Sequence, residues 1–286
     1  MKITPEPVGQ HVSEWGEGPI WNHDRLLYVD IEAHKIVAFD PTTRAEKIWD
    51  VGERVGTVVP RAGSEQCLVW AGDTGLHFLH EATGKSTSIG DPEGNQPDNR
   101  FNDGKCDPRG RLWAGTICLT KKPEASLYCL HQDFRIEKKF GPVTNSNGII
   151  WSKDDQTLFY IDTPSKKIRA FDFDPETSGI ANERVLWDTQ DDPSSPDGMT
   201  IDSEDRLWIA FCHGAKVVCF DPVSRKVIEK IDLPCIETTA CAFGGADLGD
   251  LYITTGLAKG LNEPLAGRVF VCRPGARGVV SSAFRG

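Results

Sequence analysis

Four pairs of residues combine an oxygen-bearing side chain with a following glycine: Glu17-Gly18, Asp103-Gly104, Asn147-Gly148 and Asp197-Gly198. Carboxylate and amide oxygens that face one another at close range repel or trap protons unless a cation lies between them. Oxygen ligands favour a hard or borderline divalent ion, so calcium, magnesium, manganese, zinc and ferrous iron are the candidate cofactors. So few protein ligands leave room for water or substrate, which is typical of a catalytic metal site; a partly solvated structural ion is the alternative.

These pairs can act together if the fold makes them converge, and a repeat in the sequence indicates that it does. Six short apolar runs recur about 45 residues apart, and they are rich in β-branched and aromatic residues. They are too short for helices and are typical of buried strands. The runs span residues 26–30, 67–71, 111–115, 158–162, 206–210 and 251–255.

A second motif, Phe-Asp-Pro, follows three of these runs, at residues 39–41, 173–175 and 220–222. Each copy should end a second strand, because proline cannot continue a central ladder. A third strand should then follow, as at residues 46–49 and 184–187. Repeats of this length with several strands each are typical of propeller blades.

We therefore predict an all-β fold, a six-bladed β-propeller with four-stranded blades, in which residues 1–286 form a single domain. An irregular β-sandwich with coincidental spacing is the alternative. Residues 125–140 could be drawn as an amphipathic helix, but their place in the repeat predicts strands. We expect the segment near residues 3–13 to pair with C-terminal strands, because closing the ring removes exposed edges.

The repeat also predicts where the four polar pairs lie. They stand 10 to 12 residues before the aligned centres of four of the apolar runs, and the same step lands near Val58 and Cys241 in the other two units. Equivalent positions in successive blades surround the central axis, so the four side chains should converge there. Each glycine should permit the backbone conformation that aims the preceding side chain inward. A polar residue before glycine is also common in turns, so a single pair would be weak evidence. The prediction of a shared site rests on the fact that all four pairs stand at the same offset.

Composition narrows the range of partners and compartments. The 286 residues carry a formal net charge of −10 with no run of basic residues, which makes nucleic acid and anionic membranes poor partners. No window approaches 18 uninterrupted apolar residues, and Met1–Pro7 does not resemble a secretory signal. The nine cysteines include no Cys-x-x-Cys pair. We expect a cytoplasmic protein whose cysteines are buried apolar residues rather than disulfides or a metal cage, and we infer no obligate protein partner.

Other catalytic templates are missing from the sequence. It contains no Gly-x-Ser-x-Gly elbow, no His-Glu-x-x-His pair, no phosphate-binding loop and no EF-hand loop. The seven histidines are scattered and are expected to be structural, although His213 draws notice because it directly follows a core strand. Cys118 lies just beyond residues 113–116, where it either lines the site or is simply buried.

Four segments around the polar pairs resemble the signature segments of the SMP-30/gluconolactonase/regucalcin-like family. Residues 113–116 and 242–245 are similar to further segments of the family, so the resemblance runs nearly end to end. It implies a six-bladed propeller, a single catalytic divalent ion and hydrolysis of sugar-acid lactones, with a small-molecule sugar lactone as the partner. The four signature segments read Trp15-Gly16-Glu17-Gly18-Pro19-Ile20-Trp21, Arg100-Phe101-Asn102-Asp103-Gly104-Lys105-Cys106-Asp107-Pro108, Ser146-Asn147-Gly148 with Trp151, and Ser195-Pro196-Asp197-Gly198-Met199-Thr200-Ile201-Asp202.

The resemblance also implies roles for single residues. Glu17, Asn147 and Asp197 would be the metal ligands, and Asp197 would also be the general base. Arg100 and Asn102 would contact the substrate; read alone, Arg100 also fits a surface salt bridge and Asn102 a turn former. The family pattern leaves the role of Asp103 open. A substrate-binding glutamate of some animal members is not matched, because its place falls at about Thr120, and the sugar therefore stays undecided.

Lactone hydrolysis is chemically consistent with this set of groups. A cation can polarise the lactone carbonyl and stabilise the tetrahedral oxyanion, and a carboxylate beside it can accept a proton from water. Two other functions stay open at this point: a phosphotriesterase-like or other ester hydrolase on the same metal site, and a non-enzymatic propeller that binds calcium or a partner protein.

Overall fold

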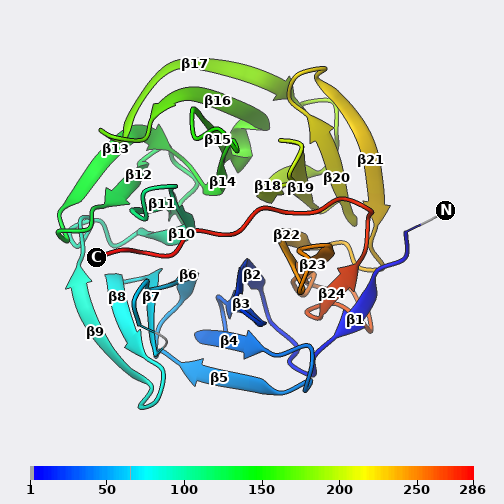
Figure 1. Cartoon of the computed structure of the whole chain (residues 1–286), viewed down its shortest axis with the longest axis horizontal. Coiled ribbons are helices and arrows are strands. Elements are labelled where there is room, and N and C mark those ends of the chain that lie inside the picture. The colour runs from blue at the N-terminus through cyan, green and yellow to red at the C-terminus, as the bar shows by residue number, and fades with distance from the viewer. Residues whose placement is uncertain (1–2, 65) are drawn as a thin grey trace.

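The computed structural model describes residues 3–64 and 66–286 and shows six four-stranded antiparallel sheets arranged around a central axis (Figure 1). The prediction of a six-bladed β-propeller is confirmed. Each of the first five blades is built from four consecutive strands. These are β2 (Gly16–Asn22), β3 (Arg25–Asp30), β4 (Lys35–Phe39) and β5 (Glu46–Asp50); β6 (Val55–Pro60), β7 (Cys67–Gly72), β8 (Gly75–His80) and β9 (Lys85–Gly90); β10 (Asn99–Cys106), β11 (Leu112–Cys118), β12 (Ala125–Leu130) and β13 (Ile136–Val143); β14 (Ser146–Trp151), β15 (Thr157–Asp162), β16 (Lys167–Asp174) and β17 (Gly179–Asp188); and β18 (Ser195–Ile201), β19 (Leu207–Cys212), β20 (Lys216–Asp221) and β21 (Lys226–Asp232).

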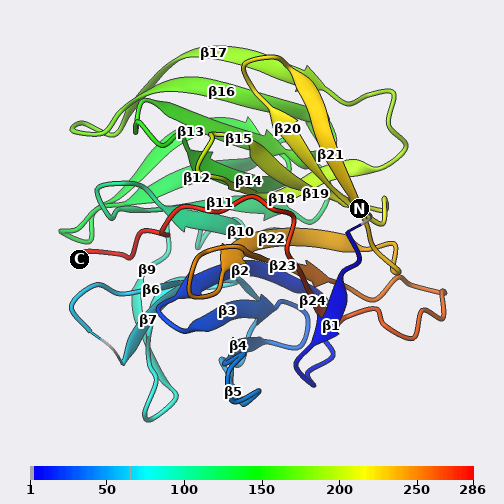
Figure 2. The same cartoon turned by 45° about the vertical axis from the view of Figure 1, so that its right-hand side comes forward.

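The sixth blade joins the two ends of the chain. Its strands are β22 (Thr238–Gly244), β23 (Asp250–Thr255), β24 (Val269–Cys272) and β1 (Glu6–Val8), in that order from the axis outward. Glu6 pairs with Val271 and Val8 with Val269, antiparallel. Figure 2 shows β1 beside β24 near the N-terminus. The predicted closure of the ring by the N-terminal segment is confirmed, since β1 covers the edge that β24 would otherwise expose.

The strands fall where the repeat predicted them. The six apolar runs form the second strand of each blade, and the three Phe-Asp-Pro motifs stand where β4, β16 and β20 end. Residues 125–140 form β12 and most of β13, so the strand prediction for them is confirmed. The one helix among the described residues is a single 3-10 turn, η1 (Thr163–Ser165), between β15 and β16, and no described helix is long and apolar enough to cross a membrane.

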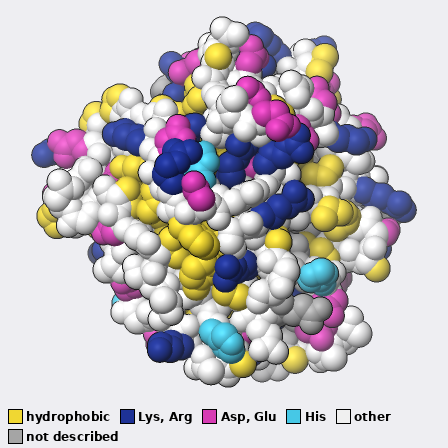
Figure 3. All heavy atoms as spheres, turned by 60° about the vertical axis from the view of Figure 1, so that its left-hand side comes forward, with side chains coloured by type: hydrophobic (Ala, Val, Ile, Leu, Met, Phe, Trp, Pro, Cys, Tyr) yellow, Lys and Arg dark blue, Asp and Glu magenta, His cyan; other side chains and the backbone are white. Residues whose placement is uncertain are grey.

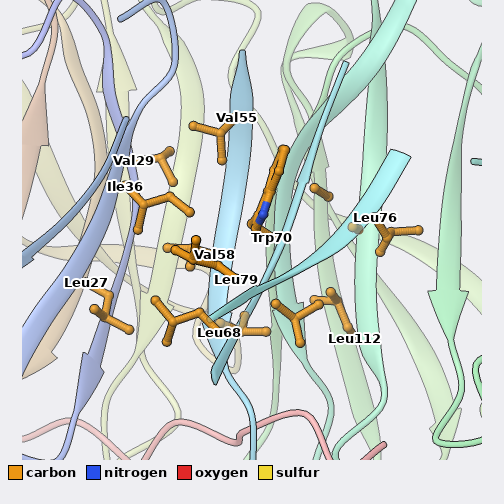
Figure 4. Packing of buried hydrophobic residues seen from close by; sticks show 14 of the residues in the cluster. Leu27, Val29, Ile36, Val55, Val58, Leu68, Trp70, Leu76, Leu79 and Leu112 are labelled. Atoms are coloured by element: carbon orange, nitrogen blue, oxygen red, sulfur yellow. The ribbon is translucent and has the colours of Figure 1, made fainter. Parts of the chain in front are cut away.

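The core lies between neighbouring blades. Side chains of the first two blades meet in Figure 4, where Leu27 and Val29 of one blade lie near Val58 and Leu68 of the next. All four are at most 1% exposed. Burying such side chains contributes roughly 1.5–3 kcal/mol each, so contacts between blades hold the ring of sheets together.

One end of the axis is crossed by the C-terminal segment, the red trace over the centre of Figure 1. The backbone of Gly278 donates a hydrogen bond to Leu248, and further along the segment Phe284 exchanges backbone hydrogen bonds with Pro60 and Ala62. Phe284 is fully buried. The segment therefore ties separate blades together and covers this end of the ring.

All nine cysteines are free, and eight of them are buried, as expected; Cys67 is partly exposed. On the face shown in Figure 3, Lys and Arg side chains are interspersed with Asp and Glu rather than forming one continuous positive area. Met1 and Lys2, which begin the N-terminal segment interpreted above, lie outside the described residues.

Candidate metal-dependent active site

A cavity of about 290 Å³ lies at the end of the axis opposite the C-terminal segment. It is lined by residues near the start of the innermost strands, among them Glu17, Asn102, Asn147 and Asp197. Three residues further along the same strands, Ile20, Lys105, Ile150 and Thr200 line a second cavity under residues 279–282. These four innermost strands therefore all run from the open end to the covered end, which explains why one offset in the sequence places Glu17, Asn147 and Asp197 in one cavity.

Every innermost strand has a register shift against its neighbour near the cavity, and such bulges re-aim side chains. In β10 the shift lies between Phe101 and Gly104. Asn102 and Asp103 lie within it, so their side chains do not have to point to opposite faces of the sheet as consecutive residues of a regular strand do. The remaining shifts lie between Glu17 and Ile20, Val55 and Thr57, Asn147 and Ile149, Pro196 and Met199, and Thr238 and Ala240.

The role predicted for the glycines of the four pairs, a special backbone conformation, is confirmed at Gly18 and is wrong for the other three. Gly18 has a positive φ of 54°, but Gly104, Gly148 and Gly198 do not adopt positive φ. A Cβ at Gly148 would instead stand 2.7 Å from the backbone oxygen of Asp197 in the next blade. Gly148 and Gly198 are thus required by close approach to the next blade, where the inner strands are crowded, whereas a Cβ at Gly104 would meet Trp113 and Ala114 of the neighbouring strand in its own blade.

Three buried carboxyl groups interact at the site. Burial and the nearby Asp103 raise the pKa of Glu17 to about 8, although the Gly18 N–H donates to Glu17 Oε2 at 2.7 Å. Burial, followed by the charges of Glu17 and Asp103, raises the pKa of Asp197 well above its ordinary value. Burial likewise raises the pKa of Asp103, and Lys105 partly offsets this. Without a cation, the three groups therefore hold protons more tightly than free carboxyl groups do.

Asp103, whose role the sequence left open, lies beside this group rather than in the cavity wall. Its Oδ1 accepts a hydrogen bond from Gly104 N–H at 2.7 Å, while its buried Oδ2 has no hydrogen-bond partner among the described residues. A buried carboxylate oxygen without a donor is costly unless a positive charge lies near it. The set of donors therefore fits a divalent cation.

The orientation of Asn147 is fixed by its neighbours. The Thr163 hydroxyl donates to Pro196 O at 2.8 Å, so its oxygen accepts from Asn147 Nδ2 at 2.7 Å. The amide oxygen of Asn147 must then point the other way, where Asn102 Nδ2 donates to it at 3.0 Å. That oxygen keeps one lone pair for a cation.

Arg100 and Asn102 are coupled to each other. Arg100 Nη1 donates to Asn102 Oδ1 at 2.9 Å and to Phe101 O at 2.8 Å, and burial lowers the pKa of Arg100 to about 10. The buried Nε of Arg100 has no partner among the described residues. Asn102 also donates to Ser146 O at 2.8 Å, so its amide lies between the arginine and the candidate metal ligand Asn147.

Two residues singled out from the sequence lie elsewhere. Thr120 is exposed and is not part of the cavity lining; its hydroxyl contacts the thiol of Cys118 at 3.1 Å. Cys118 itself is buried outside the lining, which decides between the two readings of that cysteine.

Sequence reasoning missed Glu32, Cys212 and Glu237. Glu32 and Cys212 line the cavity, and Glu237 accepts hydrogen bonds from Cys212 and His213. Glu237 lies four residues before Cys241, on which the repeat offset landed in the sixth unit. A search of a few residues around that offset would have found it.

Six four-stranded blades around an axial cavity lined by carboxyl groups define a β-propeller whose candidate site lies at the centre of the ring. The family model described as SMP-30/Gluconolactonase/LRE-like region matches residues 15–257. The chain belongs to this family.

Two curated relatives agree with this assignment. Regucalcin of Xenopus laevis is 36% identical over 299 residues, which cover 99% of each chain. The Bacillus subtilis (strain 168) protein YvrE, provisionally named a sugar lactone lactonase, is 36% identical over 84% of this chain and 82% of its own.

Solved structures share the fold over the full length. A luciferin-regenerating enzyme superposes with a TM-score of 0.90 at 28% identity, covering 98% of this chain and 99% of its own. A regucalcin of Agrobacterium tumefaciens strain C58, described as a calcium-binding protein, has a TM-score of 0.93 at 22% identity and covers 100% of this chain and 98% of its own.

Proposed function

We propose that this protein is a divalent-metal-dependent hydrolase that opens sugar-acid lactones. The observation that carries the proposal is the convergence of two buried carboxyl groups and one oriented amide oxygen on a cavity that also holds Arg100, with the buried carboxyl group of Asp103 beside them. Membership of a family with gluconolactonase in its description, and a relative provisionally named a sugar lactone lactonase, supports the choice of substrate.

Glu17, Asn147 and Asp197 would hold the ion through oxygen atoms. Such ligands suit calcium, magnesium or manganese, and zinc and ferrous iron are tested beside them. When bound, the ion would act as a Lewis acid on the lactone carbonyl and favour ionisation of water.

The protein's own groups would carry out the remaining steps. Asp197 would accept the proton of the attacking water, a contribution typically of about 10²–10⁴-fold. Arg100 would orient the ring hydroxyls or the developing carboxylate through its planar set of donors. Asn102 would act chiefly as a positioning residue, because it contacts both Arg100 and Asn147. The nine free cysteines are consistent with a reducing compartment, and we infer that the protein acts in the cytoplasm.

The test is a hydrolysis screen with protein that has been stripped of metal and reconstituted with each candidate ion. A panel of aldonolactones should be hydrolysed by the reconstituted protein alone, and Glu17→Ala and Asn147→Ala should lose metal affinity and turnover together, with partial recovery at high metal concentration. Faster turnover of an organophosphate or ester panel would replace the lactone assignment. Metal binding without turnover of any panel would indicate a non-enzymatic propeller.

A further inference from the structure

Three side chains that the lactonase mechanism does not use meet at the rim of the cavity. The ligand atoms of Cys212, His213 and Glu237 all lie within 4.8 Å of one another. We propose that these three residues form a second metal site, selective for a borderline ion such as Zn²⁺, beside the oxygen-lined site.

The fold brings the three side chains together by one local departure from strand geometry. Cys212 ends β19, and consecutive residues of a strand point to opposite faces. His213 has a φ of 62°, so the alternation stops there and both side chains reach Glu237. Glu237 directly precedes β22 in the next blade, and its backbone oxygen accepts a hydrogen bond from Gly256. Two blades therefore supply the set of ligands.

The two distances to the Glu237 carboxylate are close to those between ligand atoms of a tetrahedral site. Cys212 Sγ lies 3.2 Å from Glu237 Oε2, and His213 Nδ1 lies 2.9 Å from the same carboxylate. Zinc bonds of about 2.0–2.3 Å in a tetrahedron place neighbouring ligand atoms roughly 3.4 Å apart. For these two pairs, shifts of a few tenths of an ångström would replace the hydrogen bonds by bonds to an ion, and the remaining pair, Cys212 Sγ and the ligand nitrogen of His213, lies within 4.8 Å.

The three side chains differ in how far they are exposed to solvent. Cys212 and Glu237 are 7% and 6% exposed, whereas the side chain of His213 is 61% exposed. Two ligands are thus held by packing, and the third can adjust to an ion that enters from the cavity. Three protein ligands leave a fourth position open on the side of the cavity.

The chemistry of the ligands separates this site from the first one. Thiolate and imidazole ligands select zinc-like ions, whereas calcium and magnesium take oxygen ligands. Cys212 and the candidate ligand Asp197 line the same cavity, so the two sites are contiguous. The proposal of a second site does not depend on whether the protein hydrolyses lactones. Its test therefore measures metal binding alone.

The experiment uses the full chain, reduced and stripped with a chelator, with excess calcium to occupy oxygen ligands. Addition of Co²⁺ should produce the near-ultraviolet charge-transfer absorption of a cobalt–thiolate bond, and equilibrium dialysis against Zn²⁺ should leave one bound zinc per chain. Cys212→Ser should abolish the absorption. Cys118→Ser is the matched control, because Cys118 is also buried and its thiol is hydrogen-bonded to the hydroxyl of Thr120, and this variant should keep the absorption.

His213→Ala is a second variant that should fold normally, because this side chain is exposed to solvent. It should weaken zinc binding by about 100-fold or more, since even residues behind metal ligands contribute about 10–100-fold. Glu17→Gln should leave the cobalt–thiolate absorption in place whether or not the protein hydrolyses lactones. Wild-type protein without this absorption, or a Cys212→Ser variant that retains it, would overturn the site and leave a hydrogen-bonded triad.

Discussion

At the scale of single residues, the site depends on carboxyl groups that the fold holds in unfavourable surroundings. Glu17, Asp103 and Asp197 all have raised pKa values, with burial as the first cause. A divalent ion would reverse this effect by favouring the charged forms. Removal of the metal and a change of pH should therefore act on the same groups.

The two roles proposed for Asp197 can be separated by Asp197→Asn. The variant keeps one ligating oxygen but loses the basic carboxylate, so we expect retained metal binding and turnover lower by about 10²–10⁴-fold. Calorimetry should measure the affinity, and turnover should be compared at saturating metal so that lost occupancy does not imitate lost chemistry. Near-normal turnover of the metal-loaded variant would exclude Asp197 as the base and direct attention to Asp103.

The stability of the metal-free protein should depend on the proton of Glu17. The pKa of Glu17 is about 8 in the folded protein against an ordinary 4.5. Between these values the folded state holds a proton that the unfolded chain has released, so stability should fall as the pH rises through this range. Bound metal should remove the dependence by taking the place of the proton.

Thermal unfolding across this pH range, with chelator and with saturating metal, measures the effect. Glu17→Gln cannot ionise and should show a shallower fall than the wild type in chelator; the remaining slope belongs to Asp103 and Asp197, whose pKa values are shifted in the same direction. Equal slopes for both proteins would show that Glu17 ionises normally in the fold.

At the scale of elements, two blades fix the turn after the innermost strand with the same arrangement of an aspartate, an arginine and a tryptophan. Asp202 accepts from the backbone of Arg206 at 3.0 Å, from Arg206 Nε at 2.8 Å and from Trp208 Nε1 at 2.9 Å. Asp107 has the same contacts with Arg111 and Trp113. A buried aspartate at this turn thus anchors the turn and the second strand, which keeps the bulged inner strand in register.

Asp202→Ala should destabilise the protein by about 3–5 kcal/mol, because the variant leaves a buried indole N–H and a partly buried guanidinium without their acceptor. Urea unfolding measures the loss. Glu204→Ala is the control, since this exposed carboxylate pairs with the same Arg206 at 3.2 Å and should contribute at most about 1 kcal/mol. Similar losses in the two variants would contradict the anchoring role of Asp202.

At the scale of the whole molecule, the ring depends on a join between the two ends of the chain. Three residue pairs connect β1 to β24, and Arg268 donates a hydrogen bond to Gly9 O. The C-terminal segment closes the opposite end of the axis, so the candidate site opens to one side. Residues 1–286 should therefore unfold as a single domain in one transition, which coincident fluorescence and circular dichroism curves would verify.

Removal of residues 1–8 should destabilise the ring and expose the edge of β24 to other chains. We expect a loss of about 2 kcal/mol or more, at about 1 kcal/mol for each hydrogen bond, and a Tm lower by roughly 4–8 °C with increased aggregation. Removal of residues 1–4 keeps β1 and is the control. A truncated protein with wild-type Tm would show that β1 does not secure the closure.

The amino-acid sequence by itself determined the six-bladed fold and most of the candidate site. Strand patterns are local, and a repeat that recurs about every 45 residues places equivalent positions around one axis. Glu17, Asn147 and Asp197 could therefore be predicted to face one cavity, which the structure confirms as their location. Their roles as ligands and base remain predictions.

Features that depend on contacts between blades could be seen only in the tertiary structure. The sequence does not show that Gly148 is required by the backbone of the next blade, because that approach is set by how tightly inner strands converge. Nor does it show that Cys212 and His213 both reach Glu237, because one left-handed residue cancels the alternation of faces. Periodicity predicts which positions are equivalent, whereas the direction of a side chain depends on bulges, single dihedral angles and the neighbour that it meets.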